Sequence, residues 1–352
     1  MDKSELLSEA KRLGFDLCGV AAAGSAPHAD ALDDWLQGGF HATMEWMRRT
    51  QPERSDPRLL LPGLQSVIVL ATNYYRESPP VPSDAGRIAR YAWGADYHDV
   101  LPSRLDALAA KLDAAGGRQR CFVDGGPVLE RDWAAACGIS WHGKSTMGIN
   151  PQLGTWFILS VILTTLPLEP DPPLPDRCGS CTRCIDACPT GAIDAPFHVD
   201  ARRCISFLTI ENKGPIPLEF REAIGDRIFG CDACLDACPW NRFARESRDA
   251  QMAPSPDILR TPLRKFLSLD NTAFKATFRG SPILRAKRRG FLRNVCVALG
   301  NKGTPDDLPA LRLAAEDAEP LVREHALWAI GRIEAGRKAA DSHQPRCSTE
   351  SR

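Results

Sequence analysis

A dense group of cysteines is the strongest constraint on how this chain folds. Eight of the 13 cysteines lie between residues 178 and 238 of the 352-residue sequence. The stretch "CGSCTRCIDACPTGA" has the spacing Cys-x2-Cys-x2-Cys-x3-Cys-Pro, with which bacterial ferredoxins bind four-iron clusters. We expect no signal peptide at the N-terminus, so this grouping indicates metal binding rather than disulfides. The candidate ligands are Cys178, Cys181, Cys184, Cys188, Cys204, Cys231, Cys234 and Cys238.

The spacing also predicts how the cysteines divide between two clusters. In the ferredoxin run, three thiolates bind one cluster and the fourth binds the other. The second group, "GCDACLDACP", has only three cysteines, and Cys204 is the one other cysteine in the segment. We therefore predict one [4Fe–4S] cluster on Cys178, Cys181, Cys184 and Cys238, and another on Cys188, Cys204, Cys231 and Cys234. Structural zinc is disfavoured, because zinc sites use two separated Cys-x-x-Cys pairs.

The bulk composition is that of an ordinary globular protein without a dominant charge. Hydrophobic residues make up 43% of the chain, charged residues 25%, and the formal net charge is zero. Any nucleic-acid binding must therefore come from a local patch. The longest uncharged stretch, residues 145–168, is interrupted by "NPQLG" and by Pro167, which does not fit a membrane span. We expect a cytoplasmic monomer that does not contact a membrane.

The hydrophobic pattern predicts an α+β fold with four segments. Apolar runs at 66–71, 121–123 and 156–163 indicate buried strands, and residues 103–117 indicate an amphipathic helix. Residues 293–333 indicate three helices with short turns, similar to a HEAT repeat. The predicted segments are an N-terminal α/β domain (1–165), an inserted ferredoxin-like domain (166–250), a helical HEAT-like region (251–336) and a disordered tail (337–352).

Two familiar motifs are present in form only. "GISWHGKS" (138–145) matches the letters of a phosphate-binding loop. However, such a loop must follow a strand, and the preceding "VLERDWAAACG" indicates a helix that ends at Gly138. "DYHDVL" (96–101) nearly matches the Asp-x-His-x-x-Gly motif of cobalt-binding corrinoid proteins, but Leu101 replaces the glycine.

Several stretches, in order, resemble the epoxyqueuosine reductase family. They are "RYAWGADYHDVL", "VDGGPVLERDWAAACGISWHGKS", the cysteine segment with "RCISFLT", and "GSPILRAKRRGFLRNVCVALGN". The resemblance implies a reductase that removes the epoxide oxygen of epoxyqueuosine at the tRNA wobble position, the last step of queuosine biosynthesis. It further implies two [4Fe–4S] clusters beside a base-off cobalamin held by residues 1–165. Base-off binding needs no histidine ligand to cobalt, which suits Leu101.

The same resemblance assigns roles to individual residues. It implies that Asp124, in "FVDGGP", donates the proton to the opening epoxide oxygen; without it, a turn-capping aspartate is the simpler interpretation. Glu130 is an alternative acid, expected on the helix surface. The cofactor contacts implied are Arg54, Ala89, Tyr97, Asp124, Arg131, Gly148, Leu159 and Ser206.

A basic stretch follows the cysteine segment. "RGSPILRAKRRGFLR" (279–293) has six positive charges and no acid, which favours phosphate contacts over a merely solvated face. The predicted partners are tRNA with a GUN-type anticodon carrying epoxyqueuosine and an external low-potential electron donor. Two alternatives are a small-molecule corrinoid reductase resembling reductive dehalogenases and a ferredoxin-like electron carrier. The candidate tRNA-binding residues are Arg285, Lys287, Arg288, Arg289 and Arg293.

Overall fold

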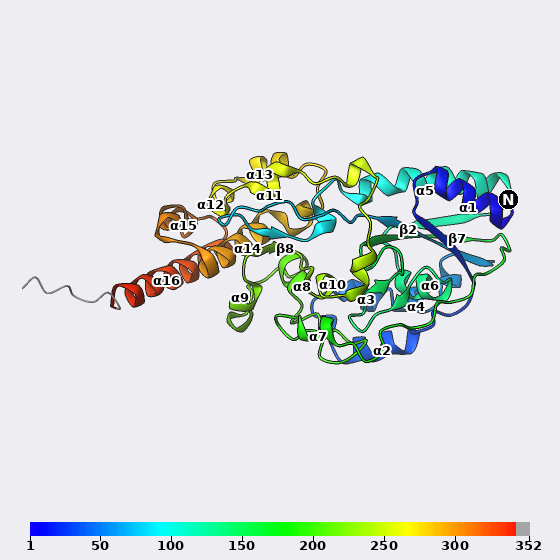
Figure 1. The fold of residues 1–352 in the computed structure, drawn as a ribbon, viewed down its shortest axis with the longest axis horizontal. Coiled ribbons are helices and arrows are strands. Elements are labelled where there is room, and N and C mark those ends of the chain that lie inside the picture. The colour runs from blue at the N-terminus through cyan, green and yellow to red at the C-terminus, as the bar shows by residue number, and fades with distance from the viewer. Residues whose placement is uncertain (343–352) are drawn as a thin grey trace, which may run out of the picture.

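The computed structural model describes residues 1–342 and shows an elongated molecule with a sheet at one end and helices at the other (Figure 1). The chain forms β-strands, α-helices and short 3-10 helices. The strands are β1 (Leu17–Ala22), β2 (Ser66–Asn73), β3 (Arg87–Ile88), β4 (Gln119–Phe122), β5 (Trp141–His142), β6 (Gly148–Ile149), β7 (Phe157–Thr164) and β8 (Arg227–Phe229). The helices are α1 (Lys3–Arg12), α2 (Ala29–Gln37), α3 (Glu45–Arg49), α4 (Gln51–Ser55), α5 (Tyr97–Ala114), α6 (Glu130–Ala136), α7 (Arg183–Asp186), α8 (Ile205–Ile210), α9 (Leu218–Ile224), α10 (Ala233–Asp236), α11 (Pro256–Arg260), α12 (Leu263–Phe266), α13 (Asn271–Thr277), α14 (Lys287–Lys302), α15 (Leu308–Ala314) and α16 (Pro320–Ser342). The short 3-10 helices are η1 (Pro57–Leu59), η2 (Arg90–Ala92), η3 (Pro239–Phe243), η4 (Ala250–Met252), η5 (Pro282–Ala286) and η6 (Pro305–Asp307).

The N-terminal sheet has the strand order β1-β2-β7-β4, and every neighbouring pair is antiparallel. The strands predicted at 66–71, 121–123 and 156–163 are therefore present as β2, β4 and β7. The expected α/β arrangement is not: antiparallel pairing makes this part of the chain α+β. The cause is that no two neighbouring strands of this sheet are parallel: α5 connects the parallel strands β2 and β4, but β7 lies between them and runs the other way.

Helices cover both faces of this sheet (Figure 1). Alternate residues of β2 point to opposite faces, so Ile68 and Leu70 pack with α1 and α5, while Val67 and Val69 pack with α6. Helix α5 begins at the N-cap Asp96, whose side chain accepts a hydrogen bond from the backbone N–H of His98. The leucines along α5 recur at helical spacing and are buried on the sheet. Both faces of the sheet are thus closed by apolar packing.

The short helix α6 shows whether residues 138–145 form a phosphate-binding loop. It is followed by Gly138 at φ 71°, a left-handed conformation that ends the helix, and then by strand β5. A phosphate-binding loop needs a strand before it and a helix after it. The order here is the reverse, so the rejection of that motif from sequence was correct.

The cysteine segment lies between the sheet and the helical end. Its short helices α7 and α10 pack against each other, and its strand β8 pairs in parallel with β3. Residues on both sides of this pairing, Ile88 and Phe229, join the hydrophobic core of the C-terminal helices. Leu235 of the same segment joins the core of the N-terminal sheet, so the cysteine segment is anchored to both ends of the molecule.

The C-terminal end contains the three predicted helices, α14, α15 and α16. Helix α14 is the central one: residues 290–300 are all buried, in contact with α16, α12 and β8. A disordered tail was expected from residue 337. This is wrong for its first residues, because α16 continues to Ser342. The rest of the expected tail lies outside the described residues. Within residues 1–342, no helix is long and apolar enough to cross a membrane.

Candidate active site

The eight cysteines of the segment fall into two groups in space. Burial raises the pKa of the Cys238 thiol to about 11, and the nearby thiols of Cys178, Cys184 and Cys181 add to the effect. Burial likewise raises the pKa of Cys234, with Cys204, Cys231 and Cys188 as its neighbours. The structure thus brings together the same two sets of four that the spacing predicts, including the crossing of Cys238 and Cys188. All eight are free thiols.

The number of cysteines in each group suits a cluster. Tetrahedral zinc holds its sulfur ligands about 2.3 Å from the metal and hence about 3.8 Å from one another. Among the described residues, no three of these cysteines form such a compact group of metal ligands. Each group has four cysteines, the number of thiolates that a four-iron cluster requires.

Asp124 lies on a strained turn directly after β4. Its φ is 51°, a left-handed conformation that is uncommon for a residue with a side chain, and the N–H of Gly125 donates to the carbonyl of Val123. The buried guanidinium of Arg54 holds the next part of the loop, donating to the carbonyl oxygens of Gly126 (3.1 Å) and Val128 (3.2 Å). Strain at a position that neighbours hold so firmly is typical of a functional site.

The Asp124 carboxylate faces the first turn of α5. The Tyr97 hydroxyl donates to Asp124 Oδ2 at 2.5 Å, and His98 Nε2 lies 3.9 Å from the same oxygen. Burial and the charge of Asp124 raise the pKa of Tyr97 far above its usual value, so Tyr97 keeps its proton and acts as the donor. The Asp124 side chain itself is 62% exposed. The carboxylate is therefore anchored through one oxygen and accessible through the rest.

Glu130 was expected on the surface, and this is wrong. Its Oε1 is buried and has no hydrogen-bond partner among the described residues. Burial, reinforced by the charge of Asp124, raises the pKa of Glu130 to about 7. The physical reason is its place in the first turn of α6, which packs back on the sheet beside the Asp124 turn. The site therefore has a second carboxyl group, the buried Glu130 with its raised pKa, in addition to the exposed Asp124.

The basic stretch meets this site at Arg285. The backbone N–H of Asp96 donates to the carbonyl of Gly280 at 2.7 Å, which places the segment beside the N-terminus of α5. Although burial opposes it, the ion pair with Glu211 and the charges of Asp124 and Tyr97 raise the pKa of the Arg285 guanidinium. Arg285 is thus the cation of the basic stretch that is nearest the candidate acid.

Only some of the candidate tRNA-binding residues are available for a ligand. Lys287 is exposed and Arg289 is partly exposed. Arg288 is instead paired with Asp317 and donates to the Leu269 carbonyl at 2.6 Å. Arg293 is completely buried, which corrects its predicted role. The reason is that α14 is surrounded by other elements, so a charge run along it points partly inward.

The comparisons with known proteins agree with this arrangement. A family model described as "Epoxyqueuosine reductase QueG, DUF1730" matches residues 54–125, and one described as "4Fe-4S double cluster binding domain" matches residues 177–241. The epoxyqueuosine reductase of Xanthomonas campestris pv. campestris is 42% identical over 91% of this chain and 93% of its own length. The chain belongs to the epoxyqueuosine reductase family. The Pseudomonas aeruginosa member is 39% identical over 92% of each chain.

Solved structures of epoxyqueuosine reductases have the same fold. One, in complex with an epoxyqueuosine-modified tRNA-Tyr stem loop, has a TM-score of 0.87 at 34% identity and covers 98% of this chain and 95% of its own. Another, from Streptococcus thermophilus, has a TM-score of 0.86 at 29% identity, over the same shares. The mixed helix-and-sheet fold with a cluster-binding domain is therefore that of the epoxyqueuosine reductases.

The remaining predicted cofactor contacts lie on several separate elements of the structure. Arg131 is exposed and donates to the Thr146 carbonyl at 2.7 Å. Ala89 is buried against Gly230, next to the second cysteine group, and Ser206 follows Cys204 on α8. Gly148 packs against Phe157, and Leu159 is half-buried in β7. Together with Arg54, these residues shape the site through packing and backbone contacts, and their contacts with the cofactor remain predictions.

Sequence reasoning missed residues that complete the site of this epoxyqueuosine reductase. Tyr91 is partly buried, edge-on to Tyr97 and beside Phe229, so it lies between the residue that anchors Asp124 and the strand that precedes Cys231. Lys213 joins the basic surface: partial burial and the positive charges of Arg285, Lys287 and Arg289 lower its pKa. The quoted "RYAWGADYHDVL" contained the signal for Tyr91, since it lies six residues before Tyr97. Lys213 had no such signal, because it is isolated from the basic run.

Proposed function

We propose that this chain reduces epoxyqueuosine to queuosine in the anticodon of tRNA, with Asp124 as the proton donor. The observation that carries the proposal is the Asp124 turn: an exposed carboxylate that is anchored by Tyr97 and faces the positive charge of Arg285. Family membership supports the reaction. The same proposal includes an external low-potential electron donor, a cytoplasmic location and a monomeric state.

Two [4Fe–4S] clusters fit the thiol groups. Each group has four cysteines, and a four-iron cluster requires four thiolates. The protein alone disfavours thiolates there, since burial raises the pKa of Cys204 and Cys231. Iron supplies the positive charge that stabilises these thiolates. We assign clusters to residues 166–250, as the sequence predicts.

A base-off cobalamin fits the residues around Asp124. The His98 Nδ1 is engaged with Asp96 at 2.8 Å and its ring is stacked on Tyr97, so His98 is held in place by the protein. Buried polar atoms without a protein partner are rare, and Ser140 Oγ and Trp141 Nε1 are two of them. They lie at the start of β5, where Trp141 packs on Trp240 of the cysteine segment. Amide groups of a corrin are suitable partners for them, and the cobalt would supply low-potential electrons for breaking the C–O bond.

The chain itself supplies and places the proton. Tyr97 donates to Asp124 Oδ2, which leaves Oδ1 to carry the transferable proton. An oxygen that is leaving a ring carbon develops negative charge, and a positioned acid lowers that cost. Arg285 beside the carboxylate contributes a fixed positive charge on the same side. Arg54 keeps the turn in the productive shape.

The basic surface of Lys213, Arg285, Lys287 and Arg289 is the proposed contact with the tRNA backbone. Phosphate contacts position an RNA, while the modified base must leave the anticodon stack to meet the acid. The helices α14, α15 and α16 support this surface as a HEAT-like unit. The proposed domain limits are 1–165 for cobalamin binding and catalysis and 251–336 for tRNA binding.

The test is single-turnover reduction of an epoxyqueuosine-bearing stem loop by anaerobically purified Asp124→Asn, compared with wild type. We expect a loss of about 10²- to 10⁴-fold, typical of a removed general acid, with iron, sulfide and cobalt contents unchanged. Asparagine tolerates the left-handed turn, so the loop should keep its shape. Asp113→Asn, at the exposed end of α5, is the control. A near-normal rate in Asp124→Asn would rule out the proposed acid.

A further inference from the structure

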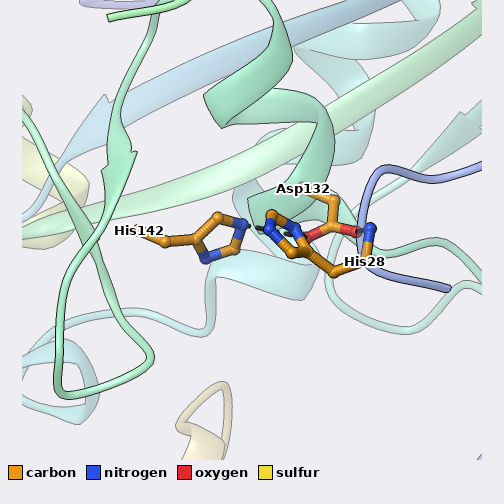
Figure 2. Close-up of side chains that lie close together, drawn as sticks. All are labelled: His28, Asp132 and His142. Atoms are coloured by element: carbon orange, nitrogen blue, oxygen red, sulfur yellow. Dashed lines mark hydrogen bonds and ion pairs between the residues drawn. The ribbon is translucent and has the colours of Figure 1, made fainter. Parts of the chain in front are cut away.

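Three side chains outside the active site converge on one point. His28 precedes α2, Asp132 lies in the first turn of α6, and His142 is on β5 (Figure 2). Asp132 Oδ1 lies 3.0 Å from His28 Nδ1 and 2.9 Å from His142 Nε2. All three ligand atoms lie within 4.8 Å of one another. We propose that this group, the His28–Asp132–His142 site, binds a divalent transition-metal ion of the zinc type.

The distances are those expected of metal ligands. A metal that binds nitrogen and carboxylate oxygen at about 2.1 Å keeps neighbouring ligands about 3.0–3.4 Å apart. The observed separations therefore need little adjustment. The donor set, two imidazoles and a carboxylate, is one that zinc uses, with a fourth position left for water. The exposed fraction of His28 is 57% and that of His142 is 25%, so solvent reaches the site.

The carboxylate is already oriented for this role. The backbone N–H of His28 donates to Asp132 Oδ2 at 3.0 Å, which leaves Oδ1 facing both rings. Hydrogen bonds that fix a ligand in this way strengthen metal sites. The two rings meet edge to face, with centroids 4.8 Å apart, and their nitrogens point at the same oxygen rather than at each other.

The alternative is a set of hydrogen bonds without metal. In that case each ring carries a proton on the nitrogen that faces Asp132 and donates it to Oδ1. A ring that binds metal through that nitrogen must instead carry its proton on the other ring nitrogen, and a doubly protonated ring cannot bind metal at all, so zinc binding weakens as the solution becomes acidic. Zinc binding itself therefore distinguishes the two arrangements without reference to activity.

A metal at this site would connect three segments of the N-terminal part of the chain. It would join the start of α2, the start of α6 and strand β5, and Asp132 is adjacent to Arg131, which contacts the loop after β5. The ion would act structurally, because none of its ligands contacts Asp124 among the described interactions of that side chain. Its occupancy would stiffen the wall that carries Glu130.

The test is zinc binding by the full holoenzyme, with clusters loaded so that the cysteines are not available. Equilibrium dialysis at pH 7.5 against micromolar zinc, with metal analysis, should give one zinc per chain. His142→Gln, His28→Gln and Asp132→Asn should each weaken binding at least 10-fold. The matched control is His198→Gln, which removes an exposed histidine–aspartate pair that has no third ligand among the described residues. Iron and sulfide contents report whether each variant is folded.

Two further outcomes decide the matter. Zinc binding to wild type should weaken as the solution becomes acidic, because protons compete with the metal for the ring nitrogens. If wild type binds no more zinc than His142→Gln, or if all three variants bind zinc as wild type does, the site is a hydrogen-bond network and the proposal is wrong. Because His28 is largely exposed, His28→Gln is expected to fold even if a substitution at buried Asp132 is not tolerated.

Discussion

Two buried arginines, one at each end of the molecule, show how differently the same side chain is used. Arg54 is 7% exposed and holds the Asp124 loop through the carbonyl oxygens of Gly126 and Val128. Arg293 is 0% exposed and holds the junction between the cysteine segment and α14, through the carbonyl oxygens of Leu208 and Gly214 among others. Among the described residues, both guanidiniums donate hydrogen bonds to uncharged oxygens.

The difference lies in what each arginine supports. Burial lowers the pKa of both guanidiniums, to about 9 for Arg293, where the charges of Arg289 and Arg221 add to the effect. Arg54 has acidic neighbours that oppose this shift, Glu130 first and then Asp124. Arg293 therefore serves the fold, whereas Arg54 serves a strained loop at the proposed site of chemistry. Loss of the first should cost stability, and loss of the second should cost turnover.

The largest effect is expected for Arg293→Met. The substitution leaves the carbonyl oxygens of the 208–214 junction buried without donors, which should destabilise the protein by about 3–5 kcal/mol. Thermal and urea unfolding of cluster-loaded protein measure it. Arg289→Met, one turn earlier on α14, is the control and should change stability by less than about 1 kcal/mol. If Arg293→Met were as stable as Arg289→Met, Arg293 would not have the structural role that distinguishes it from Arg54.

Acid should weaken the same C-terminal junction. Burial lowers the pKa of His325 to about 4; its Nε2 accepts from the Ile216 N–H at 3.1 Å and it contacts the Leu321 carbonyl. The unfolded chain takes up this proton near pH 6.5, so stability is full above that pH and falls as pH decreases toward 4. Between pH 7 and pH 5 the loss should be about 2 kcal/mol. In His325→Gln this part of the pH dependence should disappear; a variant as acid-sensitive as wild type would contradict the assignment.

The Arg54→Met variant should behave in the opposite way to Arg293→Met. It keeps much of the packing volume but releases the loop after Asp124, so we expect about 10- to 100-fold slower turnover, because misplaced acids are costly. Stability should fall by only about 1–2 kcal/mol. The control is Arg120→Met. Arg120 lies on β4, the strand before Asp124, and the substitution removes its exposed hydrogen bond to the Leu60 carbonyl. A stability loss as large as that of Arg293→Met, with normal turnover, would reverse the comparison.

Sequence patterns predicted the parts of this protein that depend on spacing. The cysteine division follows from the x2, x2, x3 run and from Cys204 being the one cysteine left over, and the structure groups the thiols in that way. The buried strands β2 and β7 follow from uninterrupted apolar runs. These features are local, so neighbouring letters are sufficient to determine them. The antiparallel pairing of β2 with β7 is not local, and apolar runs carry no information about strand direction.

Burial of charge could not be predicted from a charge run. Within 285–293, the sequence alone does not say which positives face solvent, and Arg288 and Arg293 turn inward while Lys287 does not. One signal was available: Arg293 lies in "FLRNVCVALG", where apolar residues surround it on every face of the helix. Glu130 had a weaker signal of the same kind, with Val128, Leu129 and Trp133 around it. The convergence of His28, Asp132 and His142 needs the tertiary fold, since 104 residues separate the first two.

The smallest effect is expected on the exposed basic surface, and it extends the comparison to arginines that face solvent. Lys287→Glu and Arg289→Glu should weaken stem-loop binding and reduce the slope of log affinity against log salt by about 0.7–0.9 for each phosphate that the protein no longer neutralises. Cofactor spectra and unfolding temperature should not change, because neither side chain is buried. Arg312→Glu on α15, equally exposed but distant from Arg285, is the control and should leave the salt slope unaltered. An unchanged slope in the double variant would mean that RNA binds elsewhere, and would leave Arg285 as the single cation that links this surface to the acid.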